Sequence, residues 1–556
     1  MTTDSTRCWL PDERKLVHAR LMGHLRLAIA VIAWVGTANA QTVAGVVRGV
    51  IADPSGAHVS GTTVTLTRQE TGAQRSAVSD ARGEFTITAV PPGEYRLEAE
   101  HQGFLKNART LIVEVDRDQD IHVELSLDAA GKVTVDVAGI APLVRPESPA
   151  MGGVIDNRQV LGIPLDGRDF FELSLLLPGV APAAEGSAGS VRGAFSISVN
   201  GAREDANNFL LDGAYNGDPK LNGVSVTPPV DAIREFEVAT STYDTSFGRN
   251  AGGQINVVTR SGGNQFHGTA YEFFSDGALD GTNFFAPSGQ PAPKYRRNQF
   301  GGTLGGPLVR DRTFFFVDYQ GTRTAAGQTL VTNVPTLAER NGDFSLSNLV
   351  AVDPASGQPL PGNQVPQYYL NPIGMAIAAL YPLPNRNAPA ANFVSSPSLT
   401  DGQNQFDVRL DHSFRQSDNL FARYSFVDDN LFDPFAGSSG DASIPGYGIQ
   451  VPSRAQNVAL GETHIFTPAL LNELRLAFNR VSNGDYQQGQ GTSINGQLGL
   501  PELSTNPRDW GLTLTSVNGF SAIGDDPTTP EHGTINTYQI ADNATWVRGR
   551  HLVKFG

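Results

Sequence analysis

Hydrophobic and polar residues alternate along the second half of the chain. In residues 405–414 every second side chain is apolar except His412, and the side chains between them are polar. A period of two is typical of a β-strand with one apolar and one polar face. Seven further segments show weaker versions of the pattern: 265–275, 294–309, 312–323, 419–429, 454–466, 469–482 and 536–547. A tilted strand needs roughly 9 to 11 residues to cross a bilayer, and these segments have suitable lengths.

The connections between these segments alternate in length. Short joints are predicted at 310–311, 415–418, 467–468 and 548–550, and long loops at 276–293, 324–403, 430–453 and 483–535. Short turns on one side and long loops on the other are typical of outer-membrane barrels. Aromatic residues also gather in the segments, as interfacial girdles require. With a ninth strand starting at His551, the pattern predicts part of a transmembrane antiparallel β-barrel over residues 263–556.

The first third of the chain has shorter strand patterns at regular spacing. They cover 45–53, 62–69, 83–90, 93–100, 110–116 and 121–127. Turn clusters such as Asp53-Pro54-Ser55-Gly56 and Pro91-Pro92-Gly93 separate them. Residues 43–128 are therefore predicted to form an immunoglobulin-like β-sandwich. Its role is either ligand binding or that of a passive spacer.

Residues 151–262 mix helical and extended patterns. Asp169 opens a short apolar helix, and two strands end at Asn200-Gly201 and Asp212-Gly213, which are hairpin-turn sequences. Residues 229–238 read as a short helix that enters a strand, and 252–259 as a final strand. This region is predicted to be a small α+β domain.

The N-terminus has the features of an export signal. An apolar run over 25–35 is too short to span a membrane and precedes an A-x-A cleavage site between Ala40 and Gln41. Residues 1–40 are therefore predicted to be a signal peptide, with Met22 as a second candidate start. Cleavage removes Cys8, the one cysteine, so no disulfide framework is expected.

Composition excludes several classes of protein. Hydrophobic residues make up 40% and charged residues 17% of the chain, which excludes an acidic disordered tail. The net charge is −15 and becomes −17 after cleavage, since residues 1–40 hold five basic and three acidic residues. No basic surface is expected, so nucleic acid is not a predicted partner.

No catalytic or metal-binding motif stands out. The chain has no HExxH, G-x-S-x-G or P-loop sequence, so we predict no enzyme activity, catalytic residue, cofactor or metal ligand. The glycine run 301–306 lies in a barrel segment and leads into no helix. Asp428, Asp429 and Asp433 are either Ca²⁺ ligands or part of a solvated acidic loop. Residues 371–381 are predicted to form a short helix capped by Asn371, which either contacts substrate or packs a loop.

Several motifs carry resemblances to known families. The order of signals in 45–104, with Ser79 to Phe85 and Pro92 to Leu97 at its centre, resembles the carboxypeptidase-regulatory-like module, which implies a prealbumin-like or carbohydrate-binding-like fold without peptidase activity. Residues 131–556 resemble the TonB-dependent outer-membrane receptors, specifically the Oar-like branch. The resembling stretches are 163–170, 199–213, 233–238 and 243–274.

The second resemblance implies a plug domain, 151–262, inside the barrel. It also implies a TonB box in the linker 129–150, which we place at Val133, Thr134, Val135, Asp136, Val137 and Ala138. Read without the resemblance, this segment is the last strand of the sandwich. The implied partners are the TonB energy-coupling protein, outer-membrane lipid and an extracellular ligand.

The resemblance further implies import of a bulky ligand, an oligosaccharide or a siderophore. The alternative is a surface-exposed adhesion or secretion-related protein. Plugged transporters use about 22 strands, and eight strands enclose too little space for a plug. We therefore expect this sequence to be a fragment whose barrel continues beyond Gly556.

Overall fold

The structure is a computed structural model. It describes residues 44–115, 118–127, 134–137, 151–183, 196–220, 223–243, 247–248, 250–279, 294–435, 444–548 and 551–556. The predicted signal peptide with its cleavage site at Ala40 and Gln41 lies outside these residues, as do Val133 and Ala138. Across the described ranges, no helix is both long and apolar enough to cross a membrane.

The N-terminal module is a sandwich of two sheets, as predicted. One sheet has the order β4-β1-β7 and the other β3-β2-β5-β6-β8. Val47, Leu66 and Leu97 are buried between them. The strands are β1 (Gly45–Ala52), β2 (Thr63–Arg68), β3 (Gln74–Val78), β4 (Glu84–Val90), β5 (Gly93–Glu100), β6 (Asn107–Val113), β7 (Asp118–Glu124) and β8 (Thr134–Val137).

Strand β3 is absent from the sequence-based expectation. The sequence of β3 begins with Gln74, Arg75 and Ser76 and shows no alternation of apolar and polar residues. In the described sheet β3 is an edge strand that pairs only with β2. Such a strand is held by its ladder to β2 and needs little buried surface of its own.

The domain in residues 151–262, which we call the plug as the family resemblance implies, combines a five-stranded sheet with short helices in its described residues. Its sheet order is β13-β12-β15-β14-β9, and β10 and β11 form a separate pair. The strands are β9 (Met151–Asp156), β10 (Val180–Pro182), β11 (Ile197–Val199), β12 (Asn208–Leu211), β13 (Ala214–Tyr215), β14 (Ile233–Ser241) and β15 (Gln254–Thr259). The helices are α2 (Asn157–Gly162) and the 3₁₀ turns η1 (Asp166–Arg168), η2 (Phe170–Leu176), η4 (Glu204–Ala206) and η5 (Val230–Ala232).

Local sequence explains the elements of the plug. The Asp169 carboxylate accepts a hydrogen bond from the Phe171 amide and so caps η2, the predicted short helix, which is 3₁₀. Asp212 and Gly213 join β12 to β13 with φ of 51° and 73°, the left-handed values that a two-residue hairpin requires. Gly213 is needed for a second reason, because a Cβ at this position meets the Arg475 guanidinium at 2.4 Å.

Nine antiparallel strands form the barrel sheet, and each pairs with the next one along the sheet. They are β16 (His267–Asp276), β17 (Tyr295–Val309), β18 (Thr313–Gly327), β21 (Ser398–Arg415), β22 (Asp418–Asp433), β23 (Ile449–Thr467), β24 (Leu470–Gln487), β25 (Glu531–Arg548) and β26 (His551–Phe555). Every predicted strand is present, and most run several residues further than the alternating pattern. Within the described sheet, β16 and β26 are not paired with each other, so the sheet is open.

The two faces of the sheet follow the predicted alternation. In β21, Asp407 is buried, whereas Val408 and Leu410 are exposed on the other face. In β22, Arg423 and Ser425 are buried on the inner face. Because successive side chains of a strand point to opposite faces, the exposed apolar face is the lipid face and the polar face is the interior.

Two long loops form an ordered cap at one end of the strands. It contains β19 (Leu330–Thr332), β20 (Phe393–Ser395), α3 (Leu337–Arg340), α4 (Pro372–Leu380), α5 (Ile494–Leu498), η7 (Pro361–Asn363), η8 (Gln367–Tyr369) and η9 (Pro507–Asp509), and η6 (Gly277–Leu279) follows β16. Asn371 caps α4 as predicted, accepting hydrogen bonds from the Ile373 and Gly374 amides. Ile377 packs against a small apolar core that includes Tyr381 and Ile523.

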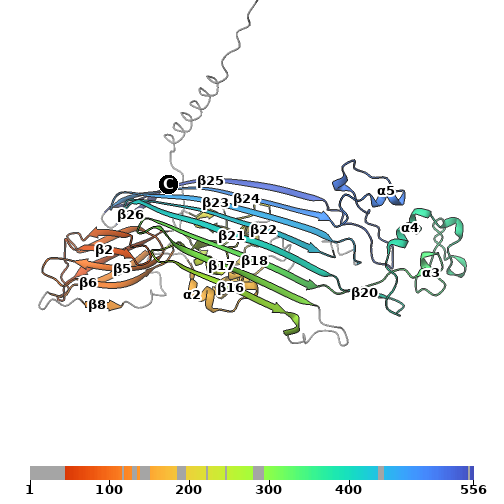
Figure 1. Ribbon diagram of the computed structural model, residues 1–556, viewed down its shortest axis with the longest axis horizontal. Helices are drawn as coiled ribbons and strands as arrows, with labels where there is room; N and C mark the ends of the chain where they lie inside the picture. The colour runs from red at the N-terminus through yellow and green to blue at the C-terminus, as the bar shows by residue number, and fades with distance from the viewer. Residues whose placement is uncertain are drawn as a thin grey trace, which may run out of the picture.

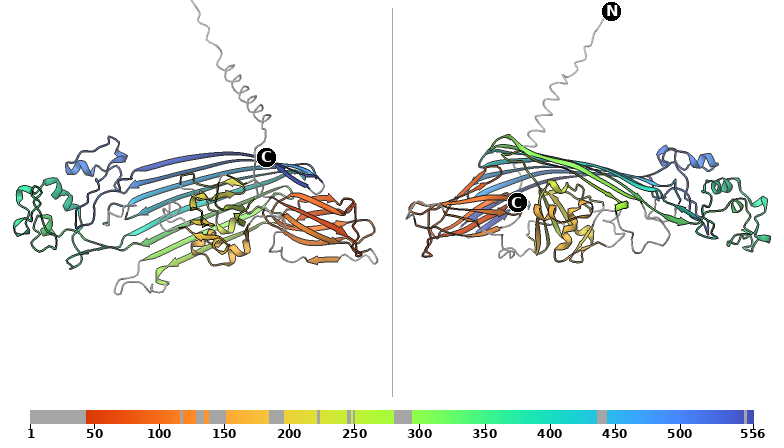
Figure 2. Two further views of the ribbon diagram at one scale, coloured as in Figure 1. Left: turned by 180° about the vertical axis from the view of Figure 1, so that it is seen from behind. Right: turned by 60° about the horizontal axis from the view of Figure 1, so that its bottom comes forward.

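The parts follow one another along the long axis of the molecule. Figure 1 shows the module at one end of the barrel strands and helices α3, α4 and α5 at the other. The sheet is curved, and the plug lies against its concave side (Figure 2). The short turns lie at the module end, so this end is the periplasmic side in the outer-membrane arrangement.

Candidate functional site

A row of polar side chains crosses the inner face of the barrel sheet where the plug sits. Its members lie opposite one another on consecutive strands, one per strand: Thr303, Asp318, Asp407, Ser425, Asn457, Asn479 and Thr537. We call these seven residues the polar belt. All but Thr537 are buried. Buried polar groups need partners, and two belt residues, Asn457 and Asn479, have theirs in the plug.

Asparagines of the belt hold the backbone of the plug. Asn457 Nδ2 donates to the Tyr215 carbonyl at 2.9 Å, and Asn479 Nδ2 donates to the Gly217 carbonyl at 2.9 Å. Gln539 of β25 accepts a hydrogen bond from the Tyr215 amide at 2.9 Å. Side chains of the barrel sheet, which we call the wall, therefore pair with the backbone hydrogen-bonding groups at the β13 edge of the plug sheet.

Asp212 of the plug is the centre of a buried ion-pair network. Its Oδ2 accepts from Arg423 Nε at 2.8 Å, and its Oδ1 accepts from Arg409 Nη1 at 3.0 Å. The amide and hydroxyl of Thr259 also donate to it, at 3.0 and 2.8 Å. Burial opposes ionisation of Asp212, but the two arginines outweigh it and lower the pKa of this carboxyl. The carboxylate is therefore charged and links the plug to β21 and β22.

Arg423 connects this network to the polar belt. Its Nη2 donates to the Leu211 carbonyl at 3.1 Å and to Asn457 Oδ1 at 2.8 Å, and its Nη1 bonds Ser425. Ser425 in turn donates to Asp407. A fully buried arginine is stable only when its donors are satisfied in this way.

A second contact lies at the other side of the plug. Arg168 pairs with Asp231 within the plug, and its guanidinium lies over the rings of Tyr271 and Phe273 at 4.8 and 4.2 Å. Gln299 of β17 donates to the Gly167 carbonyl at 2.8 Å. The predicted motif region 163–170 thus meets the first two strands of the sheet.

The module is bonded to both the plug and the barrel. Glu70 accepts from Arg234 of β14 at 2.5 Å and from Arg68 at 3.2 Å. Burial opposes ionisation of Glu70, but Arg234 and Arg68 outweigh it and lower the pKa of this carboxyl. Asn264, between the plug and β16, donates from its amide to the Glu70 carbonyl at 2.8 Å and from Nδ2 to Asp311 at 2.7 Å.

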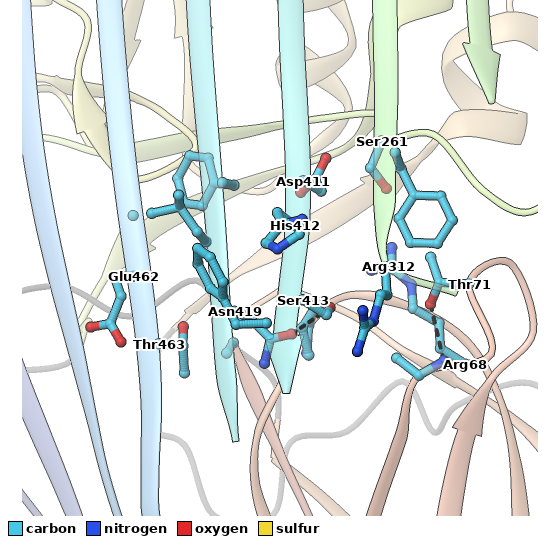
Figure 3. Close-up of a pocket in the computed structure, with 18 of the residues that line it drawn as sticks. Arg68, Thr71, Ser261, Arg312, Asp411, His412, Ser413, Asn419, Glu462 and Thr463 are labelled. Atoms are coloured by element: carbon cyan, nitrogen blue, oxygen red, sulfur yellow. Dashed lines mark hydrogen bonds between the residues drawn. The ribbon is translucent and has the colours of Figure 1, made fainter. Parts of the chain in front are cut away.

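A cavity of about 470 Å³ lies between the module, the plug and the wall. In Figure 3, Arg68 and Thr71 come from the module, whereas Arg312, Ser413 and Asn419 come from the wall. Residues with charges of both signs line it, among them Arg68, Arg75, Arg312, Arg409, Arg475, Asp212, Asp311, Asp411 and Glu473. The cavity lies on the module side of the plug, has both charged and apolar lining residues, and leaves room for movement there.

The described part of the predicted TonB box is an edge strand of the module. Residues 134–137 form β8, which runs parallel to β6 with Asn107 opposite Thr134 and Thr110 opposite Val137. This agrees with the reading of the segment as the last strand of the sandwich. Its outer edge is unpaired in the described sheet.

Two smaller expectations have definite outcomes. The loop assumed in both interpretations of Asp428, Asp429 and Asp433 is wrong: these residues belong to strand β22, so Asp428 and Asp429 point to opposite faces, and Asp428 pairs with Arg454 at 2.8 Å. The glycine run 301–306 lies within β17, as expected.

Sequence reasoning missed the residues of the ion-pair network. Arg409 and Arg423 carry a signal, since each occupies an inward position of a membrane strand, where a charge needs a partner. The partner Asp212 lies about 200 residues earlier and is hidden in a common turn sequence.

A transmembrane antiparallel sheet with an α+β domain seated on its concave face defines a plugged outer-membrane barrel protein. The chain belongs to the outer membrane beta barrel domain family, whose model matches residues 258–556, and the protein is located in the outer membrane. The carboxypeptidase regulatory-like domain model matches residues 46–126.

Known proteins resemble this chain over parts of their length. The TonB-dependent transporter Oar of Myxococcus xanthus is 31% identical over 283 residues, which are 47% of this chain and 26% of that protein. The chain thus spans about a quarter of the length of this curated relative. Among solved structures, the siderophore receptor PirA of Acinetobacter baumannii is 14% identical, with a TM-score of 0.41 over 72% of this chain and 46% of that chain. The transporter YddB of Escherichia coli is 11% identical, with a TM-score of 0.45 over 71% and 45%.

Proposed function

We propose that the protein acts in TonB-dependent transport, importing a bulky polar ligand across the outer membrane. The observation that carries this proposal is that the plug is held on the barrel sheet by polar contacts. Asp212, Asn457 and Asn479 hold the plug to the wall by hydrogen bonds and ion pairs, which water can replace one by one when the plug moves. A purely apolar interface between the plug and the barrel sheet would favour a permanently fixed plug.

Coupling to TonB is proposed for residues 133–138. A strand with an unpaired edge is a template for strand addition by a partner, and β8 has such an edge in the described sheet. Energy then comes from the inner membrane through the partner. The proposal therefore includes no cofactor and no enzymatic step.

The inner face of the barrel above the belt supports a proposal for the ligand class. Gln320, Thr322 and Gln405 are buried on this face, so their amide and hydroxyl groups meet a ligand only after neighbouring groups have moved, and they then suit a ligand rich in hydroxyl groups. We propose an oligosaccharide as the first class to test and a siderophore as the second. The carbohydrate-binding-like fold of the module supports this order.

Deletion of residues 132–138 tests the proposal. Cells that carry the deletion should keep the protein in the outer membrane and bind ligand at the surface, but lose energised uptake. The parent protein in cells lacking TonB is the matched control and should show the same loss. Uptake that continues at the parent rate in either strain would rule out TonB coupling.

The cap supports a second candidate function, surface binding or a secretion-related role without import. Its long loops share an apolar core and a hydrogen bond from Tyr381 Oη to the Ser521 carbonyl at 2.7 Å, so they form a preformed platform. Leu346 and Leu503 project from it almost completely exposed. Adhesion should survive deletion of 132–138 and fail when both leucines are replaced by serine, whereas import should show the opposite pattern.

A further inference from the structure

Three metal-ligating side chains converge on the outer face of the barrel sheet at its periplasmic end. Asp418 is the first residue of β22 and lies opposite His464 of β23. Glu462 precedes His464 by two residues, so it shares the same face. One ligand atom from each side chain lies within 4.8 Å of the others, and His464 Nδ1 is 2.5 Å from Asp418 Oδ1.

We propose that Asp418, Glu462 and His464 bind a divalent metal ion of the zinc class. One imidazole nitrogen and two carboxylate oxygens are ligands that zinc accepts, and the two negative charges neutralise the ion. No spacing motif marks this set in the sequence, because it is assembled from two strands and Asp418 is 46 residues from His464.

The geometry needs only a small adjustment to bind the ion. Tetrahedral zinc with ligands at about 2.1 Å holds them about 3.4 Å apart, so the Nδ1–Oδ1 distance has to open by about 1 Å. The side chains of Asp418 and His464 are 26% and 35% exposed, which leaves them free to rotate and leaves the remaining coordination positions open to water.

An ion pair between Asp418 and His464 does not account for the whole cluster. Among the described residues, Glu462 has no hydrogen bond or ion pair of its own, and Asp542 adds a further carboxylate on the same face, next to Leu474. Arg415, opposite Asp418 across the tight turn, supplies one further positive charge. The carboxylates therefore outnumber the cations that face them here, and a divalent ion restores the balance.

The site lies at the depth of the membrane interface. The ring of Phe466 meets His464 edge-on at 4.4 Å and is exposed on the lipid face. Exposed aromatic rings at the ends of barrel strands mark this boundary. Water and phosphate oxygens are present at this depth and can complete the coordination of an ion.

The neighbouring strand contains a matched control. His412 of β21 meets Phe414 edge-on at 4.3 Å on the same outer face. It lies between Thr313 and Leu420 rather than between carboxylates, and its Nδ1 bonds Thr313 Oγ1 at 2.8 Å. His412 therefore shares the depth and ring contact of His464 but lacks the ligand set.

The test is titration of the whole chain in detergent with zinc chloride after treatment with a chelator. We expect one saturable equivalent, and Co²⁺ bound in its place should give an absorption band of a low-symmetry site. Glu462→Gln and His464→Ala should each weaken binding at least about tenfold, the scale on which even outer-shell changes act. His412→Ala should leave binding unchanged.

Two results would overturn the proposal. One is the absence of saturable binding by the parent chain. The other is an equal affinity in the His464→Ala and His412→Ala variants, which would mean that an adventitious ion binds elsewhere. Far-ultraviolet circular dichroism of each variant checks that the sheet is retained, and the isosteric Asp418→Asn change repeats the test if His464→Ala alters the fold.

Discussion

Asp212 of the plug and Arg423 of the barrel wall lie 211 residues apart in the sequence and form an ion pair of 2.8 Å. Both side chains are buried, with 4% and 0% of their surfaces exposed. Such a pair has little net effect on stability while intact, since desolvation offsets the attraction, but an unpartnered charge in the same place is costly.

Removal of one partner should therefore release the plug. Arg423→Met leaves the Asp212 carboxylate buried with one arginine fewer, and we expect a loss of about 3–5 kcal/mol in the free energy of plug unfolding. Urea titration, followed by a fluorescent probe on the plug, measures it. Arg454→Met is the control on the next strand, since its pair with Asp428 is half exposed and contributes at most about 1 kcal/mol. Equal losses in the two variants would contradict the assignment.

Docking of the module should depend on Glu70 and on pH. The pKa of Glu70 is lowered below its usual 4.5 because Arg234 and Arg68 outweigh the effect of burial. A lowered pKa means that the contribution to stability is present above pH 4.5 and is lost as the pH falls below it. The protection factors of the backbone amides at residues 68–72 should therefore fall at low pH, and Glu70→Gln should show the reduced protection at pH 7.

A suitable control for this experiment spans the same interface. Glu94 and Arg158 also join the module to the plug, but they are 3.8 Å apart and largely exposed. Glu94→Gln should leave exchange at 68–72 unchanged. If it has the effect of Glu70→Gln, the docking depends on overall charge rather than on the Glu70 contact.

Asp169 should make the plug less stable at high pH. Burial is the largest effect and raises its pKa from 3.8 to about 6, although the Phe171 amide opposes it. The stability of the plug should therefore rise as the pH falls from about 7 to about 4. Asp169→Asn keeps the cap and removes the charge, so it should stabilise the plug by about 3 kcal/mol at pH 8 and by almost nothing at pH 4. A constant difference between pH 4 and 8 would exclude this cause.

The register of β8 can be tested by cross-linking. Arg109 of β6 and Asp136 of β8 are backbone partners in the parallel register, and Cys8 is the one native cysteine. The double variant Arg109→Cys/Asp136→Cys should form a disulfide, stop uptake because the segment can no longer leave the module, and regain uptake on reduction. The off-register pair Arg109→Cys/Val137→Cys should cross-link poorly. Uptake by the oxidised in-register variant would show that the segment functions without leaving β6.

The parts of the fold that could be predicted are those with local signals. Alternation located the barrel strands, and the turn residues Asp212 and Gly213 located a hairpin. The strand ends were less predictable: β21 begins at Ser398, seven residues before the clear alternation, because Asp401 and Gln403 lie where the strand carries polar residues on both faces. Such residues carry no pattern of period two.

The contacts of the site could not be predicted in the same way. Arg409, Arg423 and Asp212 meet only after the plug has folded against the sheet, and no local pattern records which inward charge pairs with which turn. The contact between Asn264 and Asp311 is equally non-local, since it joins the end of the plug to the first short turn. The family resemblance predicted the plug domain, but it did not predict the hydrogen bonds and ion pairs between the plug and the barrel sheet.

The four-residue ladder between β8 and β6 has a consequence for the order of events under tension. A pull on residues 134–137 acts first on this ladder, which is shorter than the ladders that β14 forms with β15 and β9 in the plug and lies outside the network around Asp212. The β8–β6 ladder and the contacts that hold the plug to the barrel sheet are connected in series along the chain, and the weaker of the two breaks first. The segment should then separate from an undisturbed module, and the pull passes onward to the plug only after this separation.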